Sequence, residues 1–325
     1  TIVLQAFSIL DPISDQLALV DDRLQEFSNS SDLPSLKQLL THVFDSTGKL
    51  ARPALTLLTA GFHPNDGEKV ITMATAVEML HVATLIHDDT VDEAETRRGR
   101  VTVSSNWGQH TAVLLGDYVF AASATYVCAT GNIRVIKRFS ETIMDLSKGQ
   151  MQETANSRNI DHGLQDYLER IYFKTASLFS TSGESGAILS GAPESTVQIL
   201  KTYSEKIGLA FQVVDDVLDI TGTEEEIGKP VGSDLLNGVI TLPTIYAMED
   251  ANCQKKIERF LADSSNGDLH SEIVQMVKSS DVKERSYEYA ERLIEEAKLA
   301  IEPLEENDCK RSLLLLADFI ISRDN

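Results

Sequence analysis

The chain has 325 residues, enough for one large or two ordinary domains with a sizeable core, so a small disulfide-stapled scaffold is excluded. It carries 29 Lys and Arg against 50 Asp and Glu, a formal net charge of −21. We therefore expect no nucleic-acid partner, because phosphate binding needs clustered cations. Hydrophobic residues make up 42% and charged residues 24%, as in ordinary folded proteins.

Cysteine usage and apolar runs predict the compartment. The three cysteines, Cys128, Cys253 and Cys309, are far apart and form no C-x-x-C pair, which indicates a reducing compartment and argues against zinc. The longest late apolar run, Leu313 to Ala317, is far too short for a bilayer, so we expect no transmembrane segment. The first residues lack a signal-peptide pattern. We expect a cytoplasmic protein, or an organelle-matrix protein if a transit peptide has been removed.

Apolar residues recur with a helical period along almost the whole chain. The first helix is predicted to begin at Asp11 and Pro12, a capping residue followed by proline. Further helices are predicted over residues 35–46, 52–62, 68–90, 105–130, 132–156, 164–190, 194–221, 240–250, 254–262, 268–279, 281–306 and 309–322. Sustained alternation of apolar and polar residues is absent from the sequence, so we predict an all-α fold. No linker divides the chain, which favours a single domain over residues 1–325.

Two segments interrupt the helical pattern. The first runs from Glu93 to Ser105, and the second is a Gly-rich stretch from Gly222 to Gly238. The second has 17 residues, longer than most loops in compact domains. Because loops of this length are commonly functional lids or disordered segments, we interpret this one as a lid.

Two acidic clusters carry the strongest functional signal: residues 88–92 read DDTVD and residues 215–219 read DDVLD. The first and last aspartates of each are one helical turn apart, where like charges repel, and both clusters close apolar helices, where the dipole disfavours anions. Both clusters go against the same two rules of helix stability, which indicates a function that outweighs local stability. Carboxylates without nearby Cys or paired His suit Mg²⁺. The alternative is a solvated acidic helix end, common in a chain this acidic.

Basic residues grouped near glycines provide the counterpart to these carboxylates. They are Lys49 with Arg52, Arg97 with Arg98, Lys174, and Lys229. Taken singly, such a residue is more often part of a surface ion pair. Together with two Mg²⁺-type clusters they predict a pocket for a diphosphate, because Arg and Lys complement phosphate oxygens.

The ordered set of motifs resembles the trans-isoprenyl diphosphate synthases. The matched segments are GKxxRP at 48–53, EMLH at 78–81, HDDxxD at 87–92, RRG at 97–99, GD at 116–117, KT at 174–175, FQxxDDxxD at 211–219, GK at 228–229 and SD at 233–234. The resemblance covers nearly the whole chain. It implies an all-α bundle around a deep central cavity, usually a homodimer. It also implies Mg²⁺-assisted condensation of isopentenyl diphosphate with an allylic diphosphate (dimethylallyl, geranyl, farnesyl or geranylgeranyl).

The resemblance also assigns roles to residues. The metal-binding residues are Asp88, Asp92 and Asp215 as direct ligands, with Asp89, Asp216 and Asp219 as ligands or supporting groups. Those implied for the allylic diphosphate are Arg97, Lys174, Thr175, Gln212 and Lys229, and those for isopentenyl diphosphate are Lys49, Arg52, His81 and Arg98. One departure is Val239, where many relatives carry Lys, so one cationic contact is absent or supplied by Lys229 alone.

Product length is predicted from the helix that precedes the first cluster. Ala83, Thr84 and Leu80 lie one and two turns before Asp88, and none of them is aromatic. In the family that this chain resembles, a bulky ring at the positions of Ala83 or Thr84 makes short products. Their small size therefore predicts a product of C20 or longer. Small residues here also suit close helix packing, which is the alternative explanation.

Four other functions stay open from the sequence. A class I terpene cyclase shares the first aspartate cluster but usually has a different second motif, and a short-chain (C15/C20) prenyl diphosphate synthase shares both. A non-catalytic partner subunit of a heteromeric synthase would be expected to have degraded aspartates. An acidic helical scaffold would bind partners through an apolar face and would need no Mg²⁺.

Overall fold

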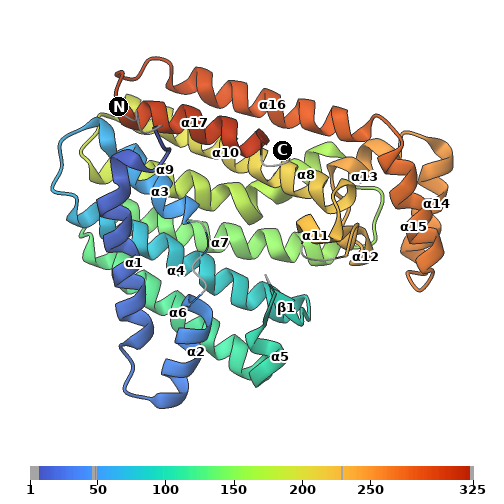
Figure 1. Ribbon diagram of the computed structural model, residues 1–325, viewed down its shortest axis with the longest axis horizontal. Helices are drawn as coiled ribbons and strands as arrows, with labels where there is room; N and C mark the ends of the chain where they lie inside the picture. Colours follow the sequence, from blue (N-terminus) through green and yellow to red (C-terminus); the bar gives the residue numbers. More distant parts are fainter. Residues whose placement is uncertain (1–6, 46–47, 49, 98, 228–229, 323–325) are drawn as a thin grey trace, which may run out of the picture. The chain divides into compact units, whose positions relative to one another are not determined.

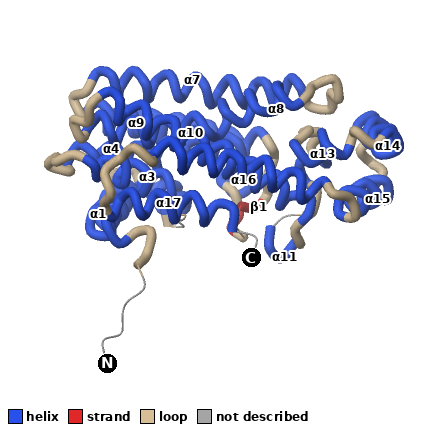
Figure 2. Tube along the Cα trace, turned by 90° about the horizontal axis from the view of Figure 1, so that it is seen from above, coloured by secondary structure: helices blue, strands red, loops and turns tan. Residues whose placement is uncertain are grey.

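The computed structural model describes residues 7–45, 48, 50–97, 99–227 and 230–322. Helices make up 78% of the structure and strands 1%, which confirms the predicted all-α fold (Figures 1 and 2). The chain folds into two compact units. Unit 1 comprises residues 1–141, 178–204 and 301–316, and unit 2 comprises residues 142–177, 205–300 and 317–325. The single domain over residues 1–325 stays a prediction.

Unit 1 contains the N-terminal helices. They are η1 (Asp11–Ile13), α1 (Ser14–Asn29), α2 (Pro34–Phe44), α3 (Ala51–Thr59), η2 (Ala60–Phe62), α4 (Glu68–Val91), α5 (Val103–Trp107) and α6 (Gln109–Ala129). Helices with residues in both units are α7 (Ile133–Asn156), α9 (Ser177–Leu189), α10 (Glu194–Thr221), α16 (Val282–Ile301) and α17 (Asp308–Ser322). The predicted helices 68–90, 132–156 and 194–221 agree with α4, α7 and α10 to within one residue.

Among the helices that lie wholly in unit 1, α4 and α6 contact each other extensively. Gly116 makes this close approach possible, because a Cβ atom there would lie 2.1 Å from Nε2 of His87 on α4. The same Nε2 is 3.1 Å from the carbonyl oxygen of Val113, at hydrogen-bonding distance. This packing fixes the end of α4 that carries the first acidic cluster.

The predicted helix 105–130 begins earlier and is interrupted. Thr102 caps α5 by accepting a hydrogen bond from the amide of Ser105 at 3.2 Å, and Gly108, with φ of +91°, separates α5 from α6. Before α5, β1 (Thr96–Arg97) pairs antiparallel with β2 (Arg100–Val101). The sequence missed this hairpin because two-residue strands are too short to show a period.

By length and composition alone, α4 and α6 could each cross a membrane. In α4, 72% of the most apolar 18-residue window is buried, as in the core helix of a soluble protein, whereas in α6 the share is 33%. Neither helix is an uninterrupted apolar run, so run length in the sequence did not reveal them. The absence of a transmembrane segment stays a prediction.

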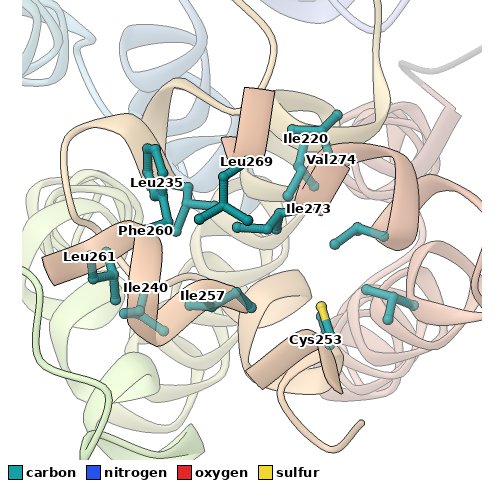
Figure 3. Packing of buried hydrophobic residues seen from close by; sticks show 13 residues of the cluster. Ile220, Leu235, Ile240, Cys253, Ile257, Phe260, Leu261, Leu269, Ile273 and Val274 are labelled. Atoms are coloured by element: carbon teal, nitrogen blue, oxygen red, sulfur yellow. The ribbon is translucent and has the colours of Figure 1, made fainter. Parts of the chain in front are cut away.

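Unit 2 contains α8 (Leu164–Ile171), the π-helical turn η3 (Tyr172–Ala176), α11 (Glu224–Ile227), α12 (Ser233–Leu236), α13 (Leu242–Ala247), α14 (Ala251–Ala262) and α15 (Gly267–Lys278). One hydrophobic cluster joins several of these helices, with Ile257, Phe260 and Ile273 fully buried at its centre (Figure 3). The predicted helical stretch 164–190 is confirmed to within one residue, and the π-helical turn η3 lies inside it, between α8 and α9.

The Gly-rich segment from Gly222 to Gly238 is partly helical, because α11 and α12 lie within it. Gly228 and Lys229 fall outside the described residues. The amide of Gly232 donates to the carbonyl oxygen of Asp219 at 2.7 Å, and the Gly232 carbonyl oxygen lies 3.0 Å from Nε2 of the buried His270. The described part is thus attached to α10 and α15. Its role as a lid stays a prediction.

Candidate active site

The first acidic cluster lies at the C-terminal end of α4, and its three carboxylates have different environments. The amide of Asp92 donates to the carbonyl oxygen of Asp88 at 2.8 Å, so these residues are one helical turn apart, as predicted. Asp92 is exposed and Asp88 is half-buried, whereas Asp89 is only 7% exposed. The cluster therefore presents two outer carboxylates and one inner carboxylate.

Arg97, on β1, holds the inner carboxylate. Its Nε donates to both carboxylate oxygens of Asp89, at 2.8 and 2.9 Å, and its Nη2 lies 2.7 Å from Oδ1. Burial lowers the pKa of Arg97, but the hydrogen bond and the charge of Asp89 outweigh burial and raise it. Arg97, predicted to bind the diphosphate, thus forms a charge-assisted pair with Asp89, a predicted metal-binding residue.

The hairpin that carries Arg97 is itself anchored. Oγ1 of Thr102 donates to the carbonyl oxygen of Ala94 at 2.6 Å, and Nε2 of His42 lies 2.8 Å from the carbonyl oxygen of Val101. His42 on α2 therefore supports the loop that follows the first cluster. Arg98 lies outside the described residues.

Two residues predicted for isopentenyl diphosphate, Arg52 on α3 and His81 on α4, lie together in unit 1. Nη1 of Arg52 is 3.2 Å from Nε2 of His81, and the Arg52 guanidinium carbon lies 4.6 Å from the centre of the Phe179 ring. Such stacking keeps a guanidinium oriented. The third residue, Lys49, lies outside the described residues.

The predicted chain-length residues lie on α4 before the first cluster. Leu80 and Ala83 are fully buried, whereas Thr84 is half-buried and donates through Oγ1 to the carbonyl oxygen of His81 at 2.6 Å. Of the three positions, Thr84 is therefore the one that a larger side chain could occupy with least disturbance of the packed core. Their part in setting product length stays a prediction.

The second acidic cluster lies near the end of α10 in unit 2. Asp215 is half-buried, whereas Asp216 is 5% exposed. Both carboxylate oxygens of Asp216 accept hydrogen bonds, Oδ2 from the hydroxyl of Tyr167 at 2.6 Å and Oδ1 from Nε2 of Gln212 at 2.8 Å. Burial raises the pKa of Asp216 to about 7, and the two hydrogen bonds oppose this effect without cancelling it.

Asp219, one turn beyond Asp215, is equally enclosed at 3% exposed. Its Oδ1 accepts from the hydroxyl of Ser233 at 2.7 Å, and its Oδ2 accepts from the amide of Asp234 at 3.1 Å. The Ser-Asp pair that the resemblance matched at 233–234 therefore fixes the last aspartate of the cluster.

The π-helical turn η3 positions Lys174 and Thr175. Oγ1 of Thr175 donates to Oε1 of Gln212 at 2.7 Å, and Nζ of Lys174 donates to Oε1 of Glu153 on α7 at 2.6 Å. The turn lies against α7 so closely that a Cβ atom at Gly149 would be 2.8 Å from the Lys174 amide nitrogen. Such turns occur frequently at functional sites. Lys229, predicted for the same diphosphate, lies outside the described residues.

The structure sorts the six aspartates into two classes. In Asp89, Asp216 and Asp219, protein donors occupy both carboxylate oxygens, and Asp88, Asp92 and Asp215 are more exposed. Within the described ranges, no three His, Cys, Asp or Glu side chains gather into a ready metal cluster. Mg²⁺ commonly needs only one or two carboxylates, because waters and phosphate oxygens supply its other ligands.

Three residues that contact the predicted site were missed in the sequence: His42, Glu153 and Tyr167. Each lies far along the chain from its partner, by 59, 21 and 49 positions respectively. Local spacing gives no signal for such pairs, because they arise only when the helices pack.

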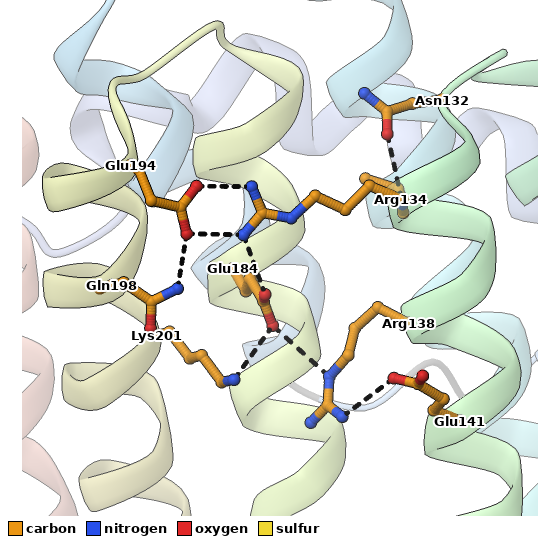
Figure 4. Close-up of polar contacts among 9 residues, drawn as sticks. Asn132, Arg134, Arg138, Glu141, Glu184, Glu194, Gln198 and Lys201 are labelled. Carbon is orange, nitrogen blue, oxygen red and sulfur yellow. Dashed lines mark hydrogen bonds and ion pairs between the residues drawn. The ribbon is translucent and has the colours of Figure 1, made fainter.

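A further charged cluster, in unit 1, surrounds Glu184 on α9, which is 5% exposed (Figure 4). Its carboxylate oxygens lie 3.7 Å from Nη2 of Arg134, 3.4 Å from Nε of Arg138 and 3.9 Å from Nζ of Lys201. Arg134 also forms a two-point pair with Glu194, which lowers the Glu194 pKa to about 2. None of these residues belongs to the predicted motifs, and the cluster ties together α7, α9 and α10 within unit 1.

Known proteins are similar to this chain over most of its length. The chain matches the polyprenyl synthetase family over residues 33–277. It is 36% identical over 312 residues to heptaprenyl diphosphate synthase component 2 of Geobacillus stearothermophilus, covering 96% of this chain and 97% of that one. It is 38% identical over 320 residues to a prenyl transferase of a Synechocystis strain, covering 97% of this chain and 98% of that one.

A solved structure gives the same result. The heptaprenyl diphosphate synthase of Staphylococcus aureus superposes with a TM-score of 0.92 at 35% identity, over 99% of this chain and 100% of that one. Sequence motifs, fold and relatives agree over nearly the whole length. The chain therefore belongs to the polyprenyl synthetase family and is an isoprenyl diphosphate synthase, a prenyltransferase.

Proposed function

We propose that the protein joins isopentenyl diphosphate to an allylic diphosphate and lengthens it to an all-trans polyprenyl diphosphate of C20 or longer. The observation that carries this proposal is the sorting of the aspartates. In each cluster protein donors fix the inner carboxylates, while the outer ones, Asp88, Asp92 and Asp215, are more exposed. The names of the relatives given above favour this function over that of a terpene cyclase.

The donor set suits Mg²⁺. The candidate ligands are carboxylates, without the thiolates or paired imidazoles that zinc prefers. Asp88 and Asp92 would hold the ion at the first cluster and Asp215 at the second. When bound, Mg²⁺ would stabilise the negative charge that develops on a departing diphosphate.

The chain's own cations would complete this stabilisation. Lys174 would neutralise the allylic diphosphate, and its pair with Glu153 would keep the ammonium in place before substrate arrives. Arg52, which stacks on Phe179, would hold isopentenyl diphosphate together with His81. Cations that are already oriented cost little reorganisation when the carbon–oxygen bond ionises.

We also propose that the protein acts as a homodimer through α6. Val113, Leu114 and Tyr118 on this helix are 44%, 56% and 41% exposed, and most of its apolar window is unburied. A second copy would cover this apolar face. The name of the Geobacillus relative, component 2, makes a requirement for a different second chain the competing case.

The test is incubation of the purified chain alone with labelled isopentenyl diphosphate and each allylic primer, with Mg²⁺ or with EDTA. We expect Mg²⁺-dependent formation of products of C20 or longer, measured by chromatography. Light scattering should report twice the mass of one chain, and Leu114→Arg should halve it. A chain that is inactive alone with every primer would contradict the proposal in this form.

A further inference from the structure

Tyr167 on α8 is a buried residue that the proposed reaction does not yet use. It is 1% exposed, and its hydroxyl donates a 2.6 Å hydrogen bond to Oδ2 of Asp216. Burial, and next the charge of Asp216, raise the pKa of Tyr167 well above its ordinary value. The hydroxyl therefore keeps its proton and acts as a constant donor to this carboxylate.

The hydrogen bond belongs to a longer chain of contacts within unit 2. Asp216 accepts its second bond from Gln212, and the Gln212 oxygen accepts from Thr175 in turn η3. Thr175 is adjacent to Lys174. One carboxylate thus connects α8, turn η3 and α10, the elements that carry Tyr167, the predicted diphosphate-binding lysine and the predicted metal ligand Asp215.

The choice of partner separates this tyrosine from one that only stabilises the fold. Tyr203 is equally buried, at 0% exposed, and its hydroxyl donates at the same 2.6 Å to a backbone carbonyl oxygen, that of Leu313 in unit 1. A backbone acceptor carries no net charge to desolvate. Tyr167 instead donates to an acidic side chain, and burying such a side chain is costly. A hydroxyl with a purely structural role does not need an acceptor of this kind.

We propose that Tyr167 is a positioning residue for the second aspartate cluster. By holding Asp216 against Gln212 it fixes the positions of Asp215 and Lys174 for Mg²⁺ and a diphosphate. The inference rests on the proposed function, because it assigns Mg²⁺ and diphosphate to this cluster. Removal of groups that support metal ligands typically weakens metal affinity or activity 10- to 100-fold, which sets the expected scale.

The test compares Tyr167→Phe with Tyr203→Phe as a matched control. Each variant removes one hydroxyl from a fully buried tyrosine and keeps the ring. The main measurement is calorimetric titration of the protein with inorganic diphosphate in Mg²⁺, which needs no turnover. We expect Tyr167→Phe to weaken binding about 10-fold, whereas Tyr203→Phe should bind as wild type does. Steady-state kinetics should show the same contrast.

A double-mutant cycle with Asp216→Ala, which removes the acceptor of the Tyr167 hydrogen bond, provides a second test. Since Tyr167 acts through Asp216, adding Tyr167→Phe to Asp216→Ala should weaken diphosphate binding less than it does in the wild-type background. Equal effects in both backgrounds, or wild-type binding by Tyr167→Phe, would overturn this inference alone. A wild-type chain that binds no diphosphate in Mg²⁺ and forms no product would instead overturn the proposed function.

Discussion

Asp216 offers a quantitative test of how much folding stability is lost by burying a charge in the second cluster when no metal ion is bound. Its pKa rises from 3.8 to about 7 on folding, chiefly because of burial. Each unit of pKa shift corresponds to about 1.4 kcal/mol, so the charged form is disfavoured by about 4 kcal/mol at high pH. Because folding raises this pKa, protonated Asp216 stabilises the fold relative to charged Asp216. This stabilisation is complete below about pH 4 and is lost as the pH rises through about 7.

The variant Asp216→Asn removes the titration and keeps the side-chain volume. Its amide oxygen still accepts from Tyr167, and a rotated Gln212 amide meets its NH₂ group. Between pH 5 and pH 8.5 the wild type should lose about 3 kcal/mol of unfolding free energy through this titration, which is most of the total penalty. The variant does not titrate here, so its free energy of unfolding relative to wild type should rise by the same amount.

Urea unfolding of EDTA-treated protein at several pH values measures this difference. Asp32→Asn, at an exposed position, is the control for loss of one surface charge. In the presence of Mg²⁺ and substrates the same Asp216→Asn change should lower turnover. A stability difference that stays constant from pH 5 to 8.5 would refute the argument that burial penalises the Asp216 charge.

Three further predictions follow from the described contacts. Asp88→Ala should lower turnover at least ~10²-fold with unchanged circular dichroism, because it removes a group that stabilises transition-state charge; a near-normal rate would exclude the ligand role. Glu184→Ala should cost about 1–3 kcal/mol in urea unfolding, since it removes the anion shared by Arg134, Arg138 and Lys201. Thr84→Phe should shorten the product in chromatography, and an unchanged length distribution would show that this position does not limit product length.

The long helices could be predicted from sequence because their signal is local. The limits of α10 agree with the predicted 194–221, since apolar period and capping act within the segment. Turn η3 could not be predicted, because nothing within residues 172–176 shows the departure from α-helix. The turn depends on residues from other helices. Gly149 on α7 lets the Lys174 backbone approach closely, and Gln212 on α10 accepts a hydrogen bond from Thr175.

The candidate site likewise combines features that follow from local spacing with features that arise only from packing. The spacing of Asp88 and Asp92 revealed a shared helix face, because one turn of helix is a local relation. Which aspartates are inner and which are outer was not visible, since that depends on Arg97 from a hairpin and on Tyr167 from another helix. Sequence motifs thus identified the residue types, and packing decided their individual environments.

This division makes the two DDxxD clusters chemically unequal despite their identical spacing. In the first, the inner carboxylate of Asp89 is balanced by the cation of Arg97 at hydrogen-bonding distance. In the second, the hydrogen bonds to Asp216 come from a phenol and an amide, and the charge of Arg170 lowers its pKa less than burial raises it. Neutral donors orient a carboxylate without neutralising it. The inner carboxylate of the second cluster therefore keeps a raised pKa, whereas that of the first cluster is paired with a guanidinium.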